Sequence, residues 1–116
     1  MRQRVYLYNV VVDNTYESKH DSIVLPTNVK KIVSICPNLV NGMGYISIFN
    51  EKTNEQLLNQ VIAADDNEHW NVKNIPVLNL PEANNLYYTL RLIESDLTKE
   101  CRLKVYVTYL EDLEEQ

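Results

Sequence analysis

Glycine is scarce in this chain: of its 116 residues, only Gly42 and Gly44 are glycines. Glycine adopts a positive φ more readily than any other residue, so tight turns elsewhere in the chain must obtain this conformation from another residue type. Asparagine is abundant, and it tolerates the left-handed region better than most residues do. The sequence therefore predicts that asparagines replace glycines in turns, although a genome rich in A and T would also explain the abundance of Asn, Ile and Lys.

Cysteine is scarce too, and Cys36 and Cys101 are the two present. Neither belongs to a CxxC pair or to another spacing typical of metal ligands. Each lies within an expected strand, where a cysteine behaves as a small apolar side chain. We therefore expect two buried free thiols in a reducing compartment rather than a disulfide.

Long apolar runs are missing. No stretch approaches the roughly 18 apolar residues that identify a membrane-spanning helix, and the residues after Arg4 do not form the apolar core of a signal peptide. We expect no membrane insertion, and a protein that is made in the cytoplasm and leaves it only as part of an assembly.

An excess of positive charge is also missing, because 11 Lys and Arg stand against 16 Asp and Glu, for a net charge of −5. The longest basic run is Lys30–Lys31. A surface of this charge repels phosphate groups, so nucleic acid is not an expected partner.

Residue sets typical of catalysis are absent as well. Residues 19–22 contain the side-chain types of a hydrolase triad, but neighbours in an extended segment point to opposite sides and cannot form one. The acidic segment Asp65–His69 lacks the alternating oxygen ligands and the glycine of a calcium loop. Gly42 and Gly44 precede a strand, whereas a phosphate-binding loop precedes a helix. We therefore expect no catalytic residue, no metal site and no cofactor, and a protein that is not an enzyme.

Alternation of apolar and polar residues is the strongest pattern present. It covers Leu86–Ile93 and Cys101–Leu110, which the polar loop Glu94–Glu100 joins. A period of two with one apolar and one mixed face is typical of half-buried antiparallel strands. We expect these strands to form a hairpin around which the rest of the chain is organised. The expected core faces are Leu86, Tyr88, Leu90 and Leu92 in the first strand and Cys101, Leu103, Val105, Val107 and Tyr109 in the second.

Further strands precede this hairpin. Arg4–Asp13 has apolar residues on both faces, which predicts burial on two sides. Pro37 is expected to end one strand, and Pro76 either to place another at a sheet edge or to make it irregular, because proline cannot donate to a ladder. Glu55–Ala64 fits either a short helix capped by Asn54 or a strand, and the strand is favoured because the preceding turn suits a hairpin. The expected strands are Arg4–Asp13, Ser22–Leu25, Val29–Cys36, Tyr45–Phe49, Glu55–Ala64 and Val72–Leu80.

Seven or eight short strands separated by turns, without a convincing helix, indicate an all-β fold. The sequence predicts a single antiparallel β-sandwich, of jelly-roll or immunoglobulin-like type, over residues 1–110. Residues 111–116 form an acidic tail that we expect to fray.

Aromatic side chains are the main candidates for a binding surface, because Trp and Tyr offer large rigid contact areas with a polar tip. Trp70 lies beside His69 in an acidic loop, where it either forms a contact or folds back to close one end of the sandwich. Several tyrosines lie opposite the expected core faces, where they either form an aromatic patch or stabilise the sheet through cross-strand pairs. Met43 lies in the loop expected to be the most flexible. The candidate interaction residues are Tyr6, Tyr8, Met43, His69, Trp70, Tyr87 and Tyr106.

This pattern over residues 4–110, with neither catalytic set, signal peptide nor basic patch, resembles small structural and decoration proteins of tailed bacteriophage virions. The resemblance implies a rigid, non-enzymatic component of a capsid, fibre or connector that contacts its own copies or other virion proteins, and that forms an oligomer. Candidate contacts are the loops Asn38–Gly44 and Asp65–Asn71 and the strand Val72–Leu80. The alternative is a carbohydrate-binding module in which Trp70 and nearby tyrosines stack on sugar rings of a glycan.

Overall fold

The computed structural model describes residues 2–13, 18–63, 78–79, 85–95 and 98–111. Within these ranges the chain forms strands and connecting turns but no helix, which confirms the expected all-β class. The strands, in chain order, are β1 (Arg2–Val12), β2 (Ser18–Ile23), β3 (Val29–Val40), β4 (Gly42–Asn50), β5 (Gln56–Ala63), β6 (Leu78–Asn79), β7 (Leu86–Ser95) and β8 (Cys101–Glu111).

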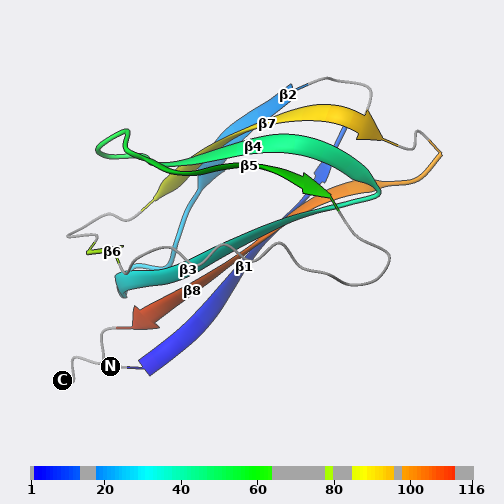
Figure 1. Ribbon diagram of the computed structural model, residues 1–116. Coiled ribbons are helices and arrows are strands. Elements are labelled where there is room, and N and C mark those ends of the chain that lie inside the picture. The colour runs from blue at the N-terminus through cyan, green and yellow to red at the C-terminus, as the bar shows by residue number, and fades with distance from the viewer. Residues whose placement is uncertain (1, 14–17, 64–77, 80–84, 96–97, 112–116) are drawn as a thin grey trace.

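The described strands form two antiparallel four-stranded sheets that lie one above the other (Figure 1). Sheet A has the order β1-β8-β3-β6, and sheet B has the order β2-β7-β4-β5. The pairing is nested, because β4 pairs with β5, β3 with β6, β2 with β7 and β1 with β8. The chain thus runs as one long antiparallel hairpin rolled into two layers, which is the jelly-roll arrangement. The fold is the expected β-sandwich, and of the two types left open it is the jelly roll.

The nested pairing corrects the hairpin expected between the last two long strands. Both strands are present where the sequence placed them, but β7 lies in sheet B between β2 and β4, whereas β8 lies in sheet A between β1 and β3. Alternation shows that a strand has one core face, and it does not show which strands are neighbours. Each of the two strands is therefore central to a different sheet.

The step from sheet A to sheet B between β3 and β4 takes a single residue, Asn41. Asn41 has a φ of 64°, in the left-handed region, and its side-chain amide donates to the carbonyl oxygen of Glu100 at 2.8 Å. Asn54, in the turn between β4 and β5, has a φ of 66°. Among the described residues, positive φ is found at these asparagines and at no glycine, which confirms the prediction made from the scarcity of glycine.

The same corner overturns two expectations. Asn41–Gly44, expected to be the most flexible loop, and the wider candidate contact loop Asn38–Gly44 are not loops, because Asn41 alone separates β3 from β4. Pro37 does not end the third strand either: it is buried within β3, opposite Val105 of β8. On its other side, the described part of β3 pairs with β6 at only two positions, Lys31 and Ile32. Among the described residues, a proline further along the strand therefore removes no ladder hydrogen bond on that side.

The remaining strands agree with the sequence to different degrees. β5 is a strand rather than a helix and forms a hairpin with β4, as favoured. β2 spans Ser18–Ile23 instead of Ser22–Leu25, so polar residues before the expected strand also pair with β7. Polar residues on a short edge strand hide its alternation, which explains this error. Of the expected strand Val72–Leu80, Leu78 and Asn79 form β6, and the remainder, Pro76 included, lies outside the described residues.

The core lies between the sheets and contains the predicted faces of β7 and β8. All five residues predicted for β8 are buried, as are three of the four predicted for β7, and Leu92 packs against them half-buried. Tyr88 is the largest fully buried side chain among the described residues. Its hydroxyl is hydrogen-bonded to the hydroxyl of Tyr8 at 3.0 Å, and the rings meet edge to face with centroids 5.5 Å apart. Burial raises the pKa of both hydroxyls, so this neutral pair joins β1 of sheet A to β7 of sheet B.

Cys36 and Cys101 are both buried and neither forms a disulfide, as the sequence predicted. Burial raises the pKa of both thiols. Since the thiolate is the reactive form, neither cysteine is suited to be a nucleophile.

Candidate functional site: the β1 edge of sheet A

Four strands form the lateral edges of the two sheets, β1 and β6 in sheet A and β2 and β5 in sheet B. An edge strand presents unpaired backbone N–H and C=O groups, so it can pair with another chain unless something prevents this. β6 has two residues, and β2 has six with Lys19, His20 and Asp21 among them. β5 pairs with β4 through a register shift. In the described part of the chain, residues 5–12 of β1 form the longest edge segment that has neither a charge, a proline nor a register shift.

β1 is long and regular. It pairs with β8 along all of its 11 residues without a register shift. From Val5 to Val12 it contains neither a charged residue nor a proline. The side chains of Val5, Leu7 and Val11 are 60%, 41% and 50% exposed. Natural edge strands usually carry a charge, a proline or a bulge that discourages pairing, so this stretch of β1 is the best described candidate for a contact with another chain.

The exposed side of β1 corrects the prediction that both of its faces are buried. The side that packs against the core carries Tyr6, Tyr8 and Val10, so the two tyrosines lie on the core side and not opposite it. A strand with apolar residues on both faces leaves the choice of buried face open. The register settles it, because Tyr8 lies opposite Val105 of β8, which is fully buried.

The outer face of sheet A extends the exposed side of β1. Leu7 of β1 lies opposite Tyr106 of β8, and Tyr106 lies opposite Cys36 of β3. Tyr106 is half-buried and lies opposite the core face of its strand, as predicted. The residues that form this surface, named here the sheet A patch, are Val5, Leu7, Val11 and Tyr106.

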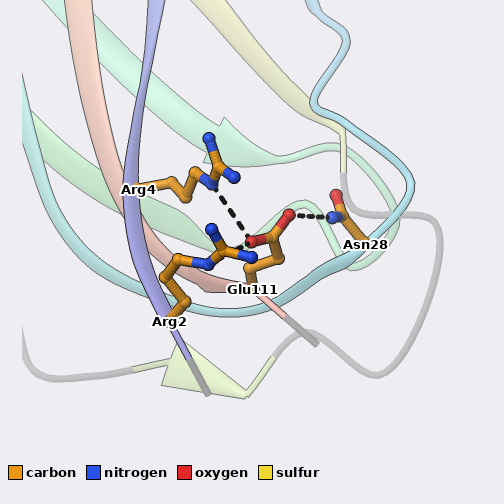
Figure 2. Close-up of polar contacts among 4 residues, drawn as sticks. All are labelled: Arg2, Arg4, Asn28 and Glu111. Carbon is orange, nitrogen blue, oxygen red and sulfur yellow. Dashed lines mark hydrogen bonds and ion pairs between the residues drawn. The ribbon is translucent and has the colours of Figure 1, made fainter. Parts of the chain in front are cut away.

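A cluster of charged and polar side chains holds the first residues of β1 at one end of sheet A (Figure 2). Arg4 Nε donates to Glu111 Oε1 at 3.1 Å, and Arg2 Nε lies 3.3 Å from the same oxygen. The other carboxylate oxygen accepts a hydrogen bond from the side-chain amide of Asn28. The hydrogen bond from Arg4, its charge, Asn28 and Arg2 together hold the pKa of Glu111 below its usual value. Glu111 therefore belongs to β8 and joins it to β1 and to the turn that contains Asn28, whereas the sequence predicted that Glu111 is part of a fraying tail. Residues 112–116 lie outside the described residues.

Replacing Glu111 with glutamine is expected to lower the melting temperature modestly at neutral pH and hardly at all in acid. A carboxylate with a lowered pKa stabilises the folded state above its ordinary pKa, and this contribution is lost as the pH falls through the lowered value. Thermal unfolding of the wild type and of Glu111→Gln from pH 7 to pH 3 measures the gap between their melting temperatures. Glu100→Gln is the control, because Glu100 forms an exposed pair with Arg102 that should matter less. A gap of equal size at every pH would contradict a role for the carboxylate charge.

The outer face of sheet B carries a row of aromatic side chains. The hydroxyl of Tyr87 is hydrogen-bonded to Nδ1 of His20 at 3.1 Å, and its ring lies beside that of Phe49 with centroids 6.4 Å apart. Tyr87 thus lies opposite the core face of β7, as predicted, and has partners within its own sheet. Nearby, Tyr45 and Val61 are 43% and 46% exposed. This face is a second apolar surface, but its aromatic centre is already engaged in cross-strand contacts.

The other candidate residues are placed in different ways. Met43 is half-buried in β4, rather than in a flexible loop. His69 and Trp70 lie outside the described residues, so their contact role stays a prediction. The exposed face of β1 is not among the sites predicted from the sequence, although the signal was present: an apolar second face on a strand without charges from Val5 to Val12.

The residue sets considered for catalysis and metal binding form no site in the described structure. Residues 19–22 lie in β2 as an extended segment, and Ser22 Oγ donates to Glu51 Oε2 at 3.0 Å. The segment Asp65–His69 lies outside the described residues. In the ranges that the structure describes, no three His, Cys, Asp or Glu side chains gather as metal ligands would. The same ranges contain no helix long and apolar enough to cross a membrane.

Comparisons of the sequence with protein-family models and with curated proteins find no match. Solved structures do match. A chain of the capsid asymmetric unit of cyanophage Pam1 aligns with a TM-score of 0.58 at 11% identity, over 95% of this chain and 85% of that chain. At this identity the match shows the fold alone, and it agrees with the jelly-roll strand order.

Two further solved structures are less similar. A family two carbohydrate esterase from Cellvibrio japonicus matches with a TM-score of 0.41 at 8% identity, over 99% of this chain and 36% of that chain. The carbohydrate-binding module CBM36, in complex with calcium and xylotriose, matches with a TM-score of 0.37 at 7% identity, over 93% of this chain and 99% of that chain. Neither similarity is close enough to bear on the function of this chain.

Proposed function

We propose that this protein is a non-enzymatic structural component of a virion, and that it acts through protein–protein contacts made by the β1 edge and the sheet A patch. The observation that carries the proposal is the edge itself: 11 residues in regular register, with apolar side chains turned to solvent and no charge from Val5 to Val12. A contact at this place would pair the open backbone groups of the edge and would cover the exposed apolar side chains of the patch.

The fold is compatible with such a role. The jelly roll holds β1 rigidly, because β8 pairs with its whole length and Tyr8 is bonded to the buried Tyr88. A preorganised strand loses little conformational entropy when a partner binds. The cyanophage Pam1 capsid chain, whose fold is similar, is a component of a capsid, and the proposal extends that role to this protein. It includes synthesis in the cytoplasm and a final location in the particle.

We expect this chain to sediment with particles when the genome that encodes it is producing them. Lysates separated on a density gradient and probed for the chain give the measurement. Val5→Lys should reduce the amount in the particle fraction several-fold, because it places a charge on the exposed edge of sheet A. Val61→Lys is the matched control, since Val61 is an exposed valine on β5, the edge of sheet B. A wild-type chain that stays entirely outside the particle fraction would contradict the proposal.

The alternative function, a carbohydrate-binding module, depends on Trp70, which lies outside the described residues. No described feature favours it over the structural role. The aromatic row of sheet B does not form an open stacking platform, because Tyr87 is hydrogen-bonded to His20 and its ring lies beside that of Phe49.

A further inference from the structure

We infer that the partner of the β1 edge is a second copy of this chain, bound antiparallel about a twofold axis so that sheet A continues from one subunit into the other. This inference rests on the proposed function and names the partner of the same surface. A twofold contact uses the same surface of both subunits, so the surface must complement itself.

The charges at the two ends of β1 favour pairing with itself in the antiparallel direction. Arg2 and Arg4 lie at the start of the strand, and Asp13 follows its last residue. Parallel pairing would set the arginines of the two copies against each other, and like charges opposite one another destabilise a sheet. Antiparallel pairing instead separates the arginines and brings each pair to the end where the partner subunit carries its aspartate. The uncharged part of β1 then overlaps in the middle.

The alternation of β1 restricts the register. Residues directly opposite each other in an antiparallel pair lie on the same face. Val5, Leu7, Asn9 and Val11 must therefore face one another across the new contact. An axis at Tyr8 places Val5 opposite Val11 of the partner subunit and Leu7 opposite Asn9 of the partner subunit. This register buries the most exposed valines of β1 against each other and overlaps Val5 to Val11 of the two copies, so that Val12 lies opposite Arg4 of the partner subunit.

The first test is the mass of the purified full chain, measured by light scattering over a concentration series. The wild type should have about twice the 13.5 kDa mass of one chain. Val5→Lys, which sets two lysines against the facing valines of each dimer, should shift the mass to that of one chain at the same concentrations. Val61→Lys should remain dimeric. Circular dichroism and melting curves of both variants show whether they are folded.

Each outcome decides the inference. A wild type that stays monomeric throughout the series overturns it, and so does a dimer that Val5→Lys leaves intact while folded. Neither of these results overturns the proposed function, which is judged separately by whether the chain is found in particles. A particle-bound chain that is monomeric in isolation would mean that the edge pairs with a different protein.

Cysteine cross-linking tests the register directly. Opposite residues in antiparallel strands have Cα atoms about 4.5–5.5 Å apart, which suits a disulfide. Val5→Cys with Val11→Cys in one chain should give a covalent dimer under mild oxidation, whereas Val5→Cys with Asn9→Cys should not. Both native cysteines are buried, and the wild type serves as the control for their reaction. Cross-linking of the second double variant instead of the first would overturn the register, and cross-linking of neither would overturn the edge contact.

Discussion

Replacing Tyr88 with alanine is expected to lower the free energy of unfolding by about 3–5 kcal/mol, the range for large buried aromatic side chains. Tyr88 is fully buried between the sheets, and its ring and hydroxyl both contact Tyr8 of the opposite sheet. Alanine would leave a cavity at this junction and an unpaired hydroxyl on Tyr8. Since a domain has about 5–15 kcal/mol of stability in total, the variant should be close to unfolding. Urea denaturation gives the value.

Two variants separate the causes of this loss. Tyr88→Phe keeps the ring and removes the bond between the hydroxyls, so it should cost roughly 1 kcal/mol. Tyr87→Ala changes the neighbouring residue, which lies on the outer face of the same strand, and should cost much less than Tyr88→Ala. Equal losses for Tyr87→Ala and Tyr88→Ala would show that the core does not lie where the structure places it.

Replacing Gly44 with alanine is expected to cost about 1–3 kcal/mol, as overpacking of a filled core does. A Cβ at this position would lie 2.9 Å from Leu90 Cδ1, 3.0 Å from the carbonyl oxygen of Arg91 and 3.2 Å from Leu39 Cδ2. A side-chain methyl can move away, but the carbonyl belongs to β7, which pairs with β4 at this point. The clash therefore outweighs the usual gain of roughly 0.5–1 kcal/mol from replacing a strand glycine with alanine.

Urea denaturation also measures this loss. Ser47→Ala, a half-buried site on the outer side of the same strand, is the control and should change stability little. The double variant Gly44→Ala with Leu90→Ala removes one of the two closest contacts, so the cost of Gly44→Ala should shrink in this background without vanishing. A Gly44→Ala variant as stable as the wild type would mean that the sheets separate easily at this corner.

Alternation predicted the residues of the core where a strand has one apolar face. In β8 it identified every buried residue of the core face, and in β7 it separated Tyr88 from Tyr87 correctly. It also favoured a strand for β5. In β1 it failed, because both faces are apolar and only the pairing of Tyr8 with Val105 decides which is buried. The exposed face that this mistake concealed is the candidate site.

Proline and glycine led to a wrong strand end and a wrong flexible loop, because the fold removes the usual constraint at these positions. Pro37 fits within β3 because the far side of that strand is unpaired there in the described structure, and no local pattern reveals this. Gly44 suggested flexibility, whereas its role is close packing between β4 and its neighbours. The identity of neighbouring strands was equally out of reach, since β7 and β8 are adjacent in sequence and belong to different sheets.

The nested pairing of the strands sets an order in which the fold can be completed. β4 and β5 meet across a short turn, so their contact needs little loop closure, whereas β1 meets β8 only after the chain between Val12 and Cys101 has been arranged. Such a high contact order is typical of slowly folding β proteins. During translation, β1 emerges first and finds its partner strand last. Until then the same apolar residues that would join two finished subunits have no neighbour, which makes the β1 edge the place where premature association competes with folding.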